Sequence, residues 1–194
     1  LGLAAGSIAE LQSTSGTGLF RVVVTKSQRH GSAFAPMHWT GQFASRARID
    51  VLVNAATDPV SGQPETKHTP IAVRPFAASW HGVLLSIRRP ALDLSDYVAV
   101  APLKGGFLAE LAGAEAPDDW DGLARLALGI DGEPSAEMLA YHDRGTGQHR
   151  FAAFSGEVMI GLLFVARTPL AIARNWAAEQ LGTAMTVAAR RSEE

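Results

Sequence analysis

Residues 138–166 read MLAYHDRGTGQHRFAAFSGEVMIGLLFVA, and this stretch predicts three consecutive antiparallel strands. Runs of apolar and aromatic residues are separated there by two turn-forming segments, Arg144 to Gly147 and Ser155-Gly156. The last run is apolar almost throughout, which fits a buried strand. We therefore expect strands over 138–142, 149–154 and 158–166.

Helices are predicted on both sides of this three-strand meander. On the N-terminal side, Asp118 can cap a helix whose apolar residues recur at helical spacing and which Gly129 ends. On the C-terminal side, Thr168 is the expected N-cap, with Pro169 at the first helical position and Gly182 after the last turn. Outward from these, we expect strands over 80–87 and 97–101 and a short helix over 107–111.

The first 75 residues predict a region of short strands. A Ser/Thr/Gly-rich turn at 13–18 joins two strands within residues 8–26. Because the pattern changes near residues 76–79, we expect a first domain over 1–76, a small α+β module over 77–183 and a polar tail over 184–194. The remaining expected elements are strands over 31–36 and 71–75, a short helix over 43–52 and a loop over 58–67. The fold class is thus mixed α+β and β-rich.

Composition excludes several classes of function. The formal net charge is −2, from 17 basic and 19 acidic residues, which gives no electrostatic reason to expect nucleic acid or an anionic membrane as partner. No apolar run approaches the roughly 18 residues that span a bilayer. The chain has no cysteine, so it offers no disulfide, thiolate metal site, cysteine nucleophile or ligand for an iron–sulfur cluster.

Catalytic and metal-binding motifs are absent from the sequence. None of the six histidines has HExxH spacing, and no GxSxG motif occurs. Gly-Thr-Gly occurs at 16–18 and at 145–147 without a dinucleotide-binding or phosphate-loop continuation, so both are interpreted as hairpin turns. We predict no catalytic and no metal-ligating residue in this chain.

Two segments have a composition suited to contact with a ligand. Residues 33–40, AFAPMHWT, place a tryptophan, a histidine and a threonine after a proline that stops a strand. Residues 57–67, TDPVSGQPETK, form a loop that two prolines restrict and that ends in Lys67, a cation able to meet an anionic cofactor. Ordinary structured loops are the alternative interpretation of both segments.

Together the segments FAPMHWT, ARIDVLV and TDPVSGQPETK resemble the C-terminal cofactor-binding domain of assimilatory nitrate reductases, members of the molybdopterin oxidoreductase superfamily. The opening LGLAAGSIAELQSTSG resembles the same domain, so the resemblance covers about residues 1–75. It implies part of a double-psi β-barrel that packs against one of two molybdopterin guanine dinucleotides. It also implies reduction of nitrate to nitrite at molybdenum.

The resemblance also implies which residues contact the cofactor. Met37, His38 and Trp39 match the segment that faces the substrate funnel and the cofactor, and Lys67 matches a cofactor-contacting lysine. Asp50 stands where the family has an asparagine; an ionised aspartate only accepts hydrogen bonds and is unfavourable beside a phosphate. Asn54, one helical turn further, is the alternative at this contact.

Three features of the family have no counterpart in this sequence. They are the upstream segment that binds the dinucleotide, the region of the molybdenum ligand, and the cysteines that bind the iron–sulfur cluster. We therefore expect a fragment with an incomplete barrel, inactive alone, in which iron–sulfur clusters lie only outside this chain. The expected partners are the rest of the same polypeptide and an electron-donor protein or domain, in the cytoplasm. The alternatives are the same region of another superfamily member, such as a formate dehydrogenase, or a stand-alone binding module. Residues 141–166 also resemble a strand meander in some flavin-dependent reductases, which implies an interface or electron-partner docking role.

Overall fold

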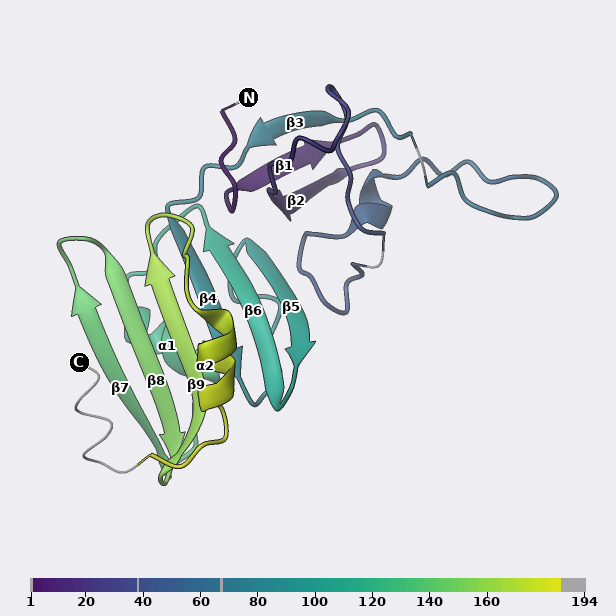
Figure 1. Cartoon of the computed structure of the whole chain (residues 1–194). Helices are drawn as coiled ribbons and strands as arrows, with labels where there is room; N and C mark the ends of the chain where they lie inside the picture. Colours follow the sequence, from purple (N-terminus) through teal and green to yellow (C-terminus); the bar gives the residue numbers. More distant parts are fainter. Residues whose placement is uncertain (1, 38, 67, 186–194) are drawn as a thin grey trace.

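Two antiparallel sheets carry the fold, as Figure 1 shows for the computed structural model, which describes residues 2–37, 39–66 and 68–185. The smaller sheet has the strand order β2-β1-β3 and the larger one β5-β6-β4-β9-β8-β7. The first contains β1 (Ile8–Gln12), β2 (Thr17–Arg21) and β3 (Ala72–Pro75). The second contains β4 (Trp80–Ser86), β5 (Tyr97–Leu103), β6 (Gly106–Gly113), β7 (Ala136–Asp143), β8 (Gln148–Ser155) and β9 (Val158–Ala166). The predicted β-rich, mixed α+β class is confirmed.

The β1–β2 hairpin forms as its turn chemistry predicts. The Ser13 side-chain oxygen accepts hydrogen bonds from the amides of Ser15 and Gly16, which fixes the turn. Gly16 is required by a close approach, since a Cβ there would lie 2.6 Å from the carbonyl oxygen of Val51. Described residues 2–75 contain three strands and no closed barrel, so membership of a double-psi barrel stays a prediction.

The predicted meander is confirmed as β7, β8 and β9, but the helix expected over 107–111 is wrong. Those residues lie inside β6, which pairs with β4 on one side and β5 on the other. Leu108 packs in the cluster on one face of the sheet and Leu111 in the cluster on the opposite face. Two neighbouring strands therefore override the local pattern.

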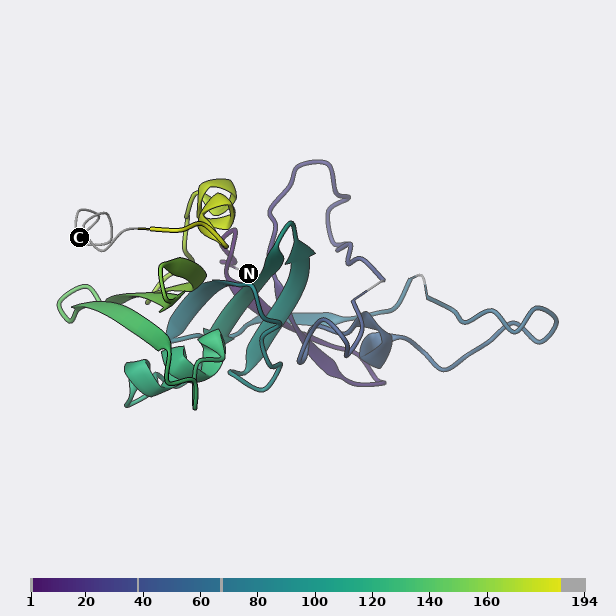
Figure 2. The ribbon, with the colours of Figure 1, turned by 90° about the horizontal axis from the view of Figure 1, so that it is seen from below.

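Helices cover both faces of the six-stranded sheet, as Figure 2 shows. Helix α1 (Trp120–Leu128) begins after Asp119, whose side chain accepts from the amide of Gly122, and ends at Gly129 in the left-handed conformation. The N-cap is thus Asp119, one residue later than expected. Buried Ala124, Ala127 and Leu128 of α1 pack on one face.

Helix α2 (Arg174–Gln180) covers the other face and is shorter than predicted. Its N-cap is Ala173, so the expected start at Thr168 and Pro169 is wrong. Leu170 and Ile172 both pack into the same cluster as α2. Side chains two residues apart reach one surface from an extended chain, so burial of this pair holds the segment out of the helix.

Two further predictions fail in the segment between β2 and β3. Residues 31–36 form no strand in the described part of the chain, and the helix expected over 43–52 shrinks to the 3-10 helix η1 (Ile49–Leu52). The reason is that residues 40–43 form a turn and Ala44 then forms an isolated β-bridge with Ala99 of β5. A hydrogen-bonding partner in the second sheet therefore replaces the local helix.

The two sheets share one buried cluster. Its members come from both sides of the predicted boundary at residue 76, namely Ile8, Leu19, Ala44 and Ala47 on one side and Tyr97, Ala99 and Ala112 on the other. The domain limits themselves stay predictions. Within the described residues, no helix is both long and apolar enough to cross a bilayer.

Candidate functional site

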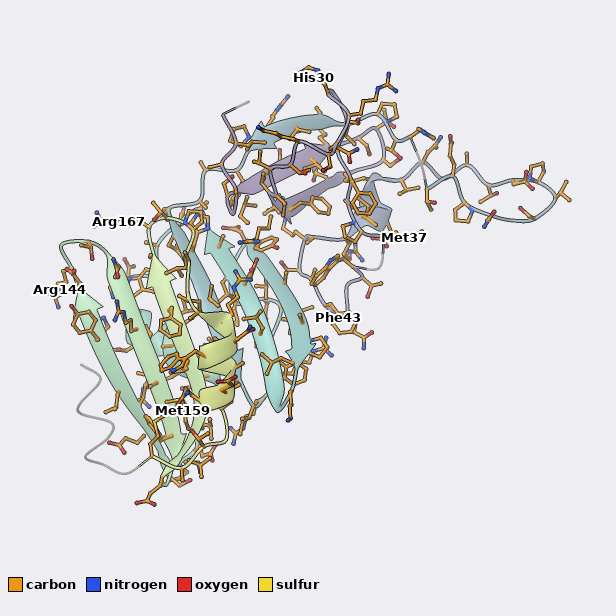
Figure 3. The ribbon with its side chains drawn as sticks, in the orientation of Figure 1. His30, Met37, Phe43, Arg144, Met159 and Arg167 are labelled. Carbon is orange, nitrogen blue, oxygen red and sulfur yellow. The ribbon has the colours of Figure 1, made fainter. Side chains whose placement is uncertain are left out.

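The predicted cofactor-facing residues lie on the segment that leads from the first sheet to η1. Met37 is exposed, whereas Trp39 is half-buried and packs against the cluster that both sheets share. Asp50 is exposed in η1, and the alternative Asn54 is exposed beyond it. His38 and Lys67 lie outside the described residues. Figure 3 shows Met37 near η1 and Phe43 beside β5.

An open depression lies along this segment. It has a volume of about 460 Å³ and is lined by Gly41, Ala44, Ser45, Arg48, Leu92 and Asp93. Because the depression is wide open to solvent, it suits contact with one edge of a ligand and does not enclose it. The depression is lined by residues from both sides of residue 76, since Leu92 and Asp93 come from the connection between β4 and β5.

Arg48 is the candidate binding residue that sequence reasoning missed. Its side chain lies against Gly41, where an added Cβ would be 3.3 Å from the Arg48 Cδ atom. A guanidinium presents a planar fork of donors that suits phosphate and carboxylate groups. Arg48 stands in the ARID motif two residues before Asp50, and the resemblance implies a cofactor contact only for Asp50.

The loop over residues 57–67 has an internally fixed tip. The Asp58 carboxylate accepts from the amides of Val60 and Ser61 at 3.0 and 2.7 Å and from the Ser61 hydroxyl at 2.9 Å. The Ser61 amide, the Ser61 hydroxyl and the Val60 amide lower the pKa of Asp58, in that order. Thr57 pairs with Pro64, so the loop is a narrow excursion that extends away from both sheets (Figure 1).

The backbone is strained immediately after Lys67. His68 has φ +63°, the left-handed region that side-chain-bearing residues rarely adopt. Such strain persists only where the surroundings enforce it, and it gathers at binding sites.

Comparison with known proteins agrees with this geometry. Residues 1–70, which hold Trp39, Arg48 and the Asp58 loop, match the model of the molydopterin dinucleotide binding domain. The match thus covers 70 of the 194 residues. The resemblance seen in the sequence is thereby confirmed.

Two curated relatives carry the name nitrate reductase. The protein from Klebsiella oxytoca is 37% identical over 115 residues, which is 59% of this chain and 13% of the relative. The protein from Synechocystis sp. (strain ATCC 27184 / PCC 6803 / Kazusa) is 33% identical over 64 residues, which is 33% of this chain and 9% of the relative. The chain thus spans about an eighth or less of the length of these relatives. No solved structure matches it significantly.

The region that matches the family model offers a donor set that fits one edge of such a cofactor. Arg48 supplies a cation in the lining of the depression, and Trp39 supplies a half-buried aromatic surface on the segment that leads to it. Asp93 also lines the depression, so this surface presents an acceptor for polar N–H groups as well as a cation for an anion. The exposed carboxylate of Asp50 suits N–H donors of a base or pterin and disfavours a phosphate.

A cluster of charged residues joins the first sheet to the larger sheet. The Glu110 carboxylate meets Nε of Arg21 at 3.0 Å and Nη2 of Arg174 at 2.6 Å. We call these three residues the Glu110 cluster. It ties β2, β6 and α2 together beside a cavity of about 20 Å³, which holds no more than a water-sized molecule. Burial, then the charge of Arg21, lowers the pKa of the adjacent His81.

A second polar cluster lies where α1 meets the β7–β8 hairpin. The Nδ1 atoms of His142 and His149 are 2.9 Å apart, and Nε2 of His142 is 3.3 Å from Asp121. The ring of His149 stacks on Trp120 at 4.7 Å, and burial followed by the charge of His142 lowers its pKa. One Nδ1 atom must donate and the other accept, so this contact requires that at least one ring be neutral. No group of three or more metal-ligating side chains occurs among the described residues.

Proposed function

We propose that this chain is the cofactor-binding C-terminal region of a molybdenum-dependent nitrate reductase of the assimilatory type. The observation that carries the proposal is the family match over residues 1–70, which contains every predicted cofactor-facing residue. The identity of 37% to a nitrate reductase supports nitrate as the substrate of the complete protein. The cofactor, when bound, supplies the redox chemistry at molybdenum, and this chain supplies part of its binding surface.

Exposed apolar side chains support the proposal that further polypeptide packs on the dinucleotide-binding region. Its irregular segments leave several large hydrophobic residues largely in solvent, namely Val23, Val24, Phe34, Met37 and Val60. Phe34 is 79% exposed and Val60 is 94% exposed. Burial of such side chains is worth about 1.5–3 kcal/mol each, so they favour a covering partner. In the proposal, that partner is the rest of the same reductase.

The finer parts of the proposal follow from the same family. The cofactor is the bis form of molybdopterin guanine dinucleotide, held jointly with domains outside this chain, and iron–sulfur clusters also lie outside it. Met37, His38, Trp39, Asp50 and Lys67 face the cofactor. The complete protein works in the cytoplasm and takes electrons from a donor protein or domain.

Lys67→Met in the complete polypeptide tests the site. Loss of a charge-assisted contact costs about 1.5–3 kcal/mol, which weakens retention of the cofactor by roughly one to two factors of ten. Molybdenum and guanine nucleotide contents of the purified protein are the measurements. Lys67→Arg is milder because the charge survives. Full cofactor content and wild-type activity in Lys67→Met would remove Lys67 from the site.

A second test addresses catalysis. The isolated 194-residue chain reduces no nitrate with reduced viologen dye, because the proposal places the metal and the clusters in other domains. The complete polypeptide, assayed in parallel, is the positive control. Measurable nitrite formation by the isolated chain would overturn the assignment of catalysis to the other domains.

A further inference from the structure

Residues 42–46, which we call the pinned segment, run along the free edge of β5. The Ser45 amide donates to the carbonyl oxygen of Val98 at 2.9 Å, and the Val98 amide donates back to the Ser45 hydroxyl at 2.9 Å. The Val100 amide donates to the carbonyl oxygen of Phe43 at 2.7 Å. The pinned segment is thus joined to the edge of β5 by an isolated β-bridge between Ala44 and Ala99 and by the hydrogen bonds that flank it.

The opposite side of the pinned segment is held by the first sheet. The Leu19 amide in β2 donates to the carbonyl oxygen of Arg46 at 3.0 Å. The approach is close enough that a Cβ at Gly18 would lie 2.9 Å from that same oxygen. Backbone hydrogen bonds on both sides leave this segment little freedom to move independently of either sheet.

Arg89 adds a side-chain clamp from the connection that follows β4. Its guanidinium carbon lies 5.3 Å from the centre of the Phe43 ring, and its Nη2 atom donates to the carbonyl oxygen of Gln42. A cation over an aromatic face and a charged donor on a carbonyl both favour one position of the segment. Arg89 therefore acts on the backbone of the segment and on its aromatic side chain at once.

Trp39 precedes the pinned segment in the chain and Arg48 follows it, so the segment sets the position of both candidate binding residues. Ala44 and Ser45 of the segment also line the depression, together with Leu92 and Asp93. The connection between β4 and β5 thus lines part of the depression. Strand β5 holds the pinned segment, which lines another part.

We propose that β5 and Arg89 form a positioning device for the cofactor-facing segment, and that this is a function of residues 77–183. Arg89 is a positioning residue: it acts through Phe43 and Gln42 and not by contact with the cofactor. The proposal rests on the proposed function. It goes beyond it because it assigns a role in cofactor retention to the part of the chain that follows the family match.

The neighbouring arginine provides a matched control. Arg88 points to the end of α1, where Nη1 donates to the carbonyl oxygen of Gly129 and Nη2 meets Glu133, both at 2.5 Å. Arg88→Leu therefore removes the same charge and a similar number of contacts from the adjacent position. It leaves the pinned segment intact, so it reports the cost of losing an arginine contact in general.

The experiment compares Arg89→Leu, Arg88→Leu and Arg89→Lys in the complete polypeptide. The measurements are guanine nucleotide retained after dialysis, KM and kcat for nitrate, the unfolding temperature, and hydrogen exchange at the Val98 and Val100 amides. We expect Arg89→Leu to lower retention about tenfold and to speed exchange at both amides. Arg88→Leu should retain cofactor as wild type does despite a similar drop in unfolding temperature, and Arg89→Lys should recover part of the retention.

Each outcome decides between the two proposals. Equal cofactor retention in Arg89→Leu and Arg88→Leu, with cofactor present in the wild type, would overturn the positioning role and leave the proposed function standing. Faster exchange without loss of cofactor would overturn it as well, because the segment would then move without consequence. A complete wild-type polypeptide that contains no pterin dinucleotide would overturn the proposed function itself.

Discussion

Glu110→Gln removes the charge at the centre of the Glu110 cluster and changes little else. The variant has nearly the shape of the native side chain, so it leaves no cavity. Its amide keeps one oxygen that can accept from either Arg21 or Arg174, but not a negative charge for both. Two guanidinium groups then share one neutral acceptor, with the half-buried His81 nearby.

The expected loss in unfolding free energy is about 2 kcal/mol. Hydrogen bonds to charged groups contribute roughly 1.5–3 kcal/mol each, and the variant gives up about one of the two. Solvent screening reduces the contribution of these ion pairs to the unfolding free energy, because about a third of each arginine side chain is exposed: 34% for Arg21 and 33% for Arg174. Glu110 is only 18% exposed, which keeps the value above that of a surface pair.

Urea unfolding of the 194-residue chain, followed by tryptophan fluorescence, measures this loss. For a chain of this length about 2 kcal/mol corresponds to a fall in unfolding temperature of roughly 4–8 °C. Arg21→Met and Arg174→Met, alone and combined with Glu110→Gln, divide the effect between the two ion pairs. A Glu110→Gln variant within 0.5 kcal/mol of wild type, on the scale of ordinary surface substitutions, would refute the reasoning.

Three further predictions concern the larger sheet. Trp80→Ala should cost about 3–5 kcal/mol in urea unfolding, because the buried ring packs edge-on to Trp120 at 5.4 Å; a loss below 1 kcal/mol would contradict this packing. The lowered pKa of His149, like that of His81, favours the neutral ring in the folded state, so stability is greatest above the ordinary histidine pKa of about 6.5 and falls as the pH drops below it. Urea titrations between pH 5 and 8 should show a shallower pH dependence in His149→Gln than in wild type, and an unchanged slope would count against the burial of this ring. Asp119→Ala removes the cap of α1 and should cost about 1 kcal/mol by the same assay, with Asp119→Asn close to wild type; equal losses in both would show that the cap is not the cause.

Local chemistry made part of the fold predictable from sequence. Helix α1 was recognised because its start and its end at Gly129 depend on residues within it and beside it. The β1–β2 hairpin was recognised because Ser13 and the glycines carry their own turn signal. In both cases the deciding interactions span only a few residues.

The failures share a different cause. In β6 the partly buried Leu108 and the buried Leu111 and Ala112 pack on two faces of a sheet that helices cover on both sides. Their spacing therefore imitates the i, i+3, i+4 pattern of a helix, and periodicity cannot separate the two. The predicted start of α2 was wrong for a similar reason. Leu170 and Ile172 pack against residues distant in the sequence, and this packing overrides the helix-start signal of Pro169.

The candidate site was predictable as a segment but not as a set of contacts. Composition singled out the neighbourhood of Trp39, and the resemblance supplied Asp50. Arg89 was not identified because its partner Gln42 lies 47 residues away in the chain. Arg48 was missed because its closeness to Gly41 depends on how the segment folds, which no local pattern encodes.

The pairing of Ala44 with Ala99 also constrains the order in which the chain can fold during synthesis. The ribosome releases residues 43–45 well before β5, so this early segment waits without its hydrogen-bonding partner until residues 97–100 emerge. Domains usually complete themselves from the N-terminus onward as they are translated. Here the first region can close its shared core only after part of the second has been made. Until then Ile8, Leu19 and Ala44 lack the apolar surface that Tyr97 and Ala99 provide, so this interval is when a nascent chain most needs protection by a chaperone.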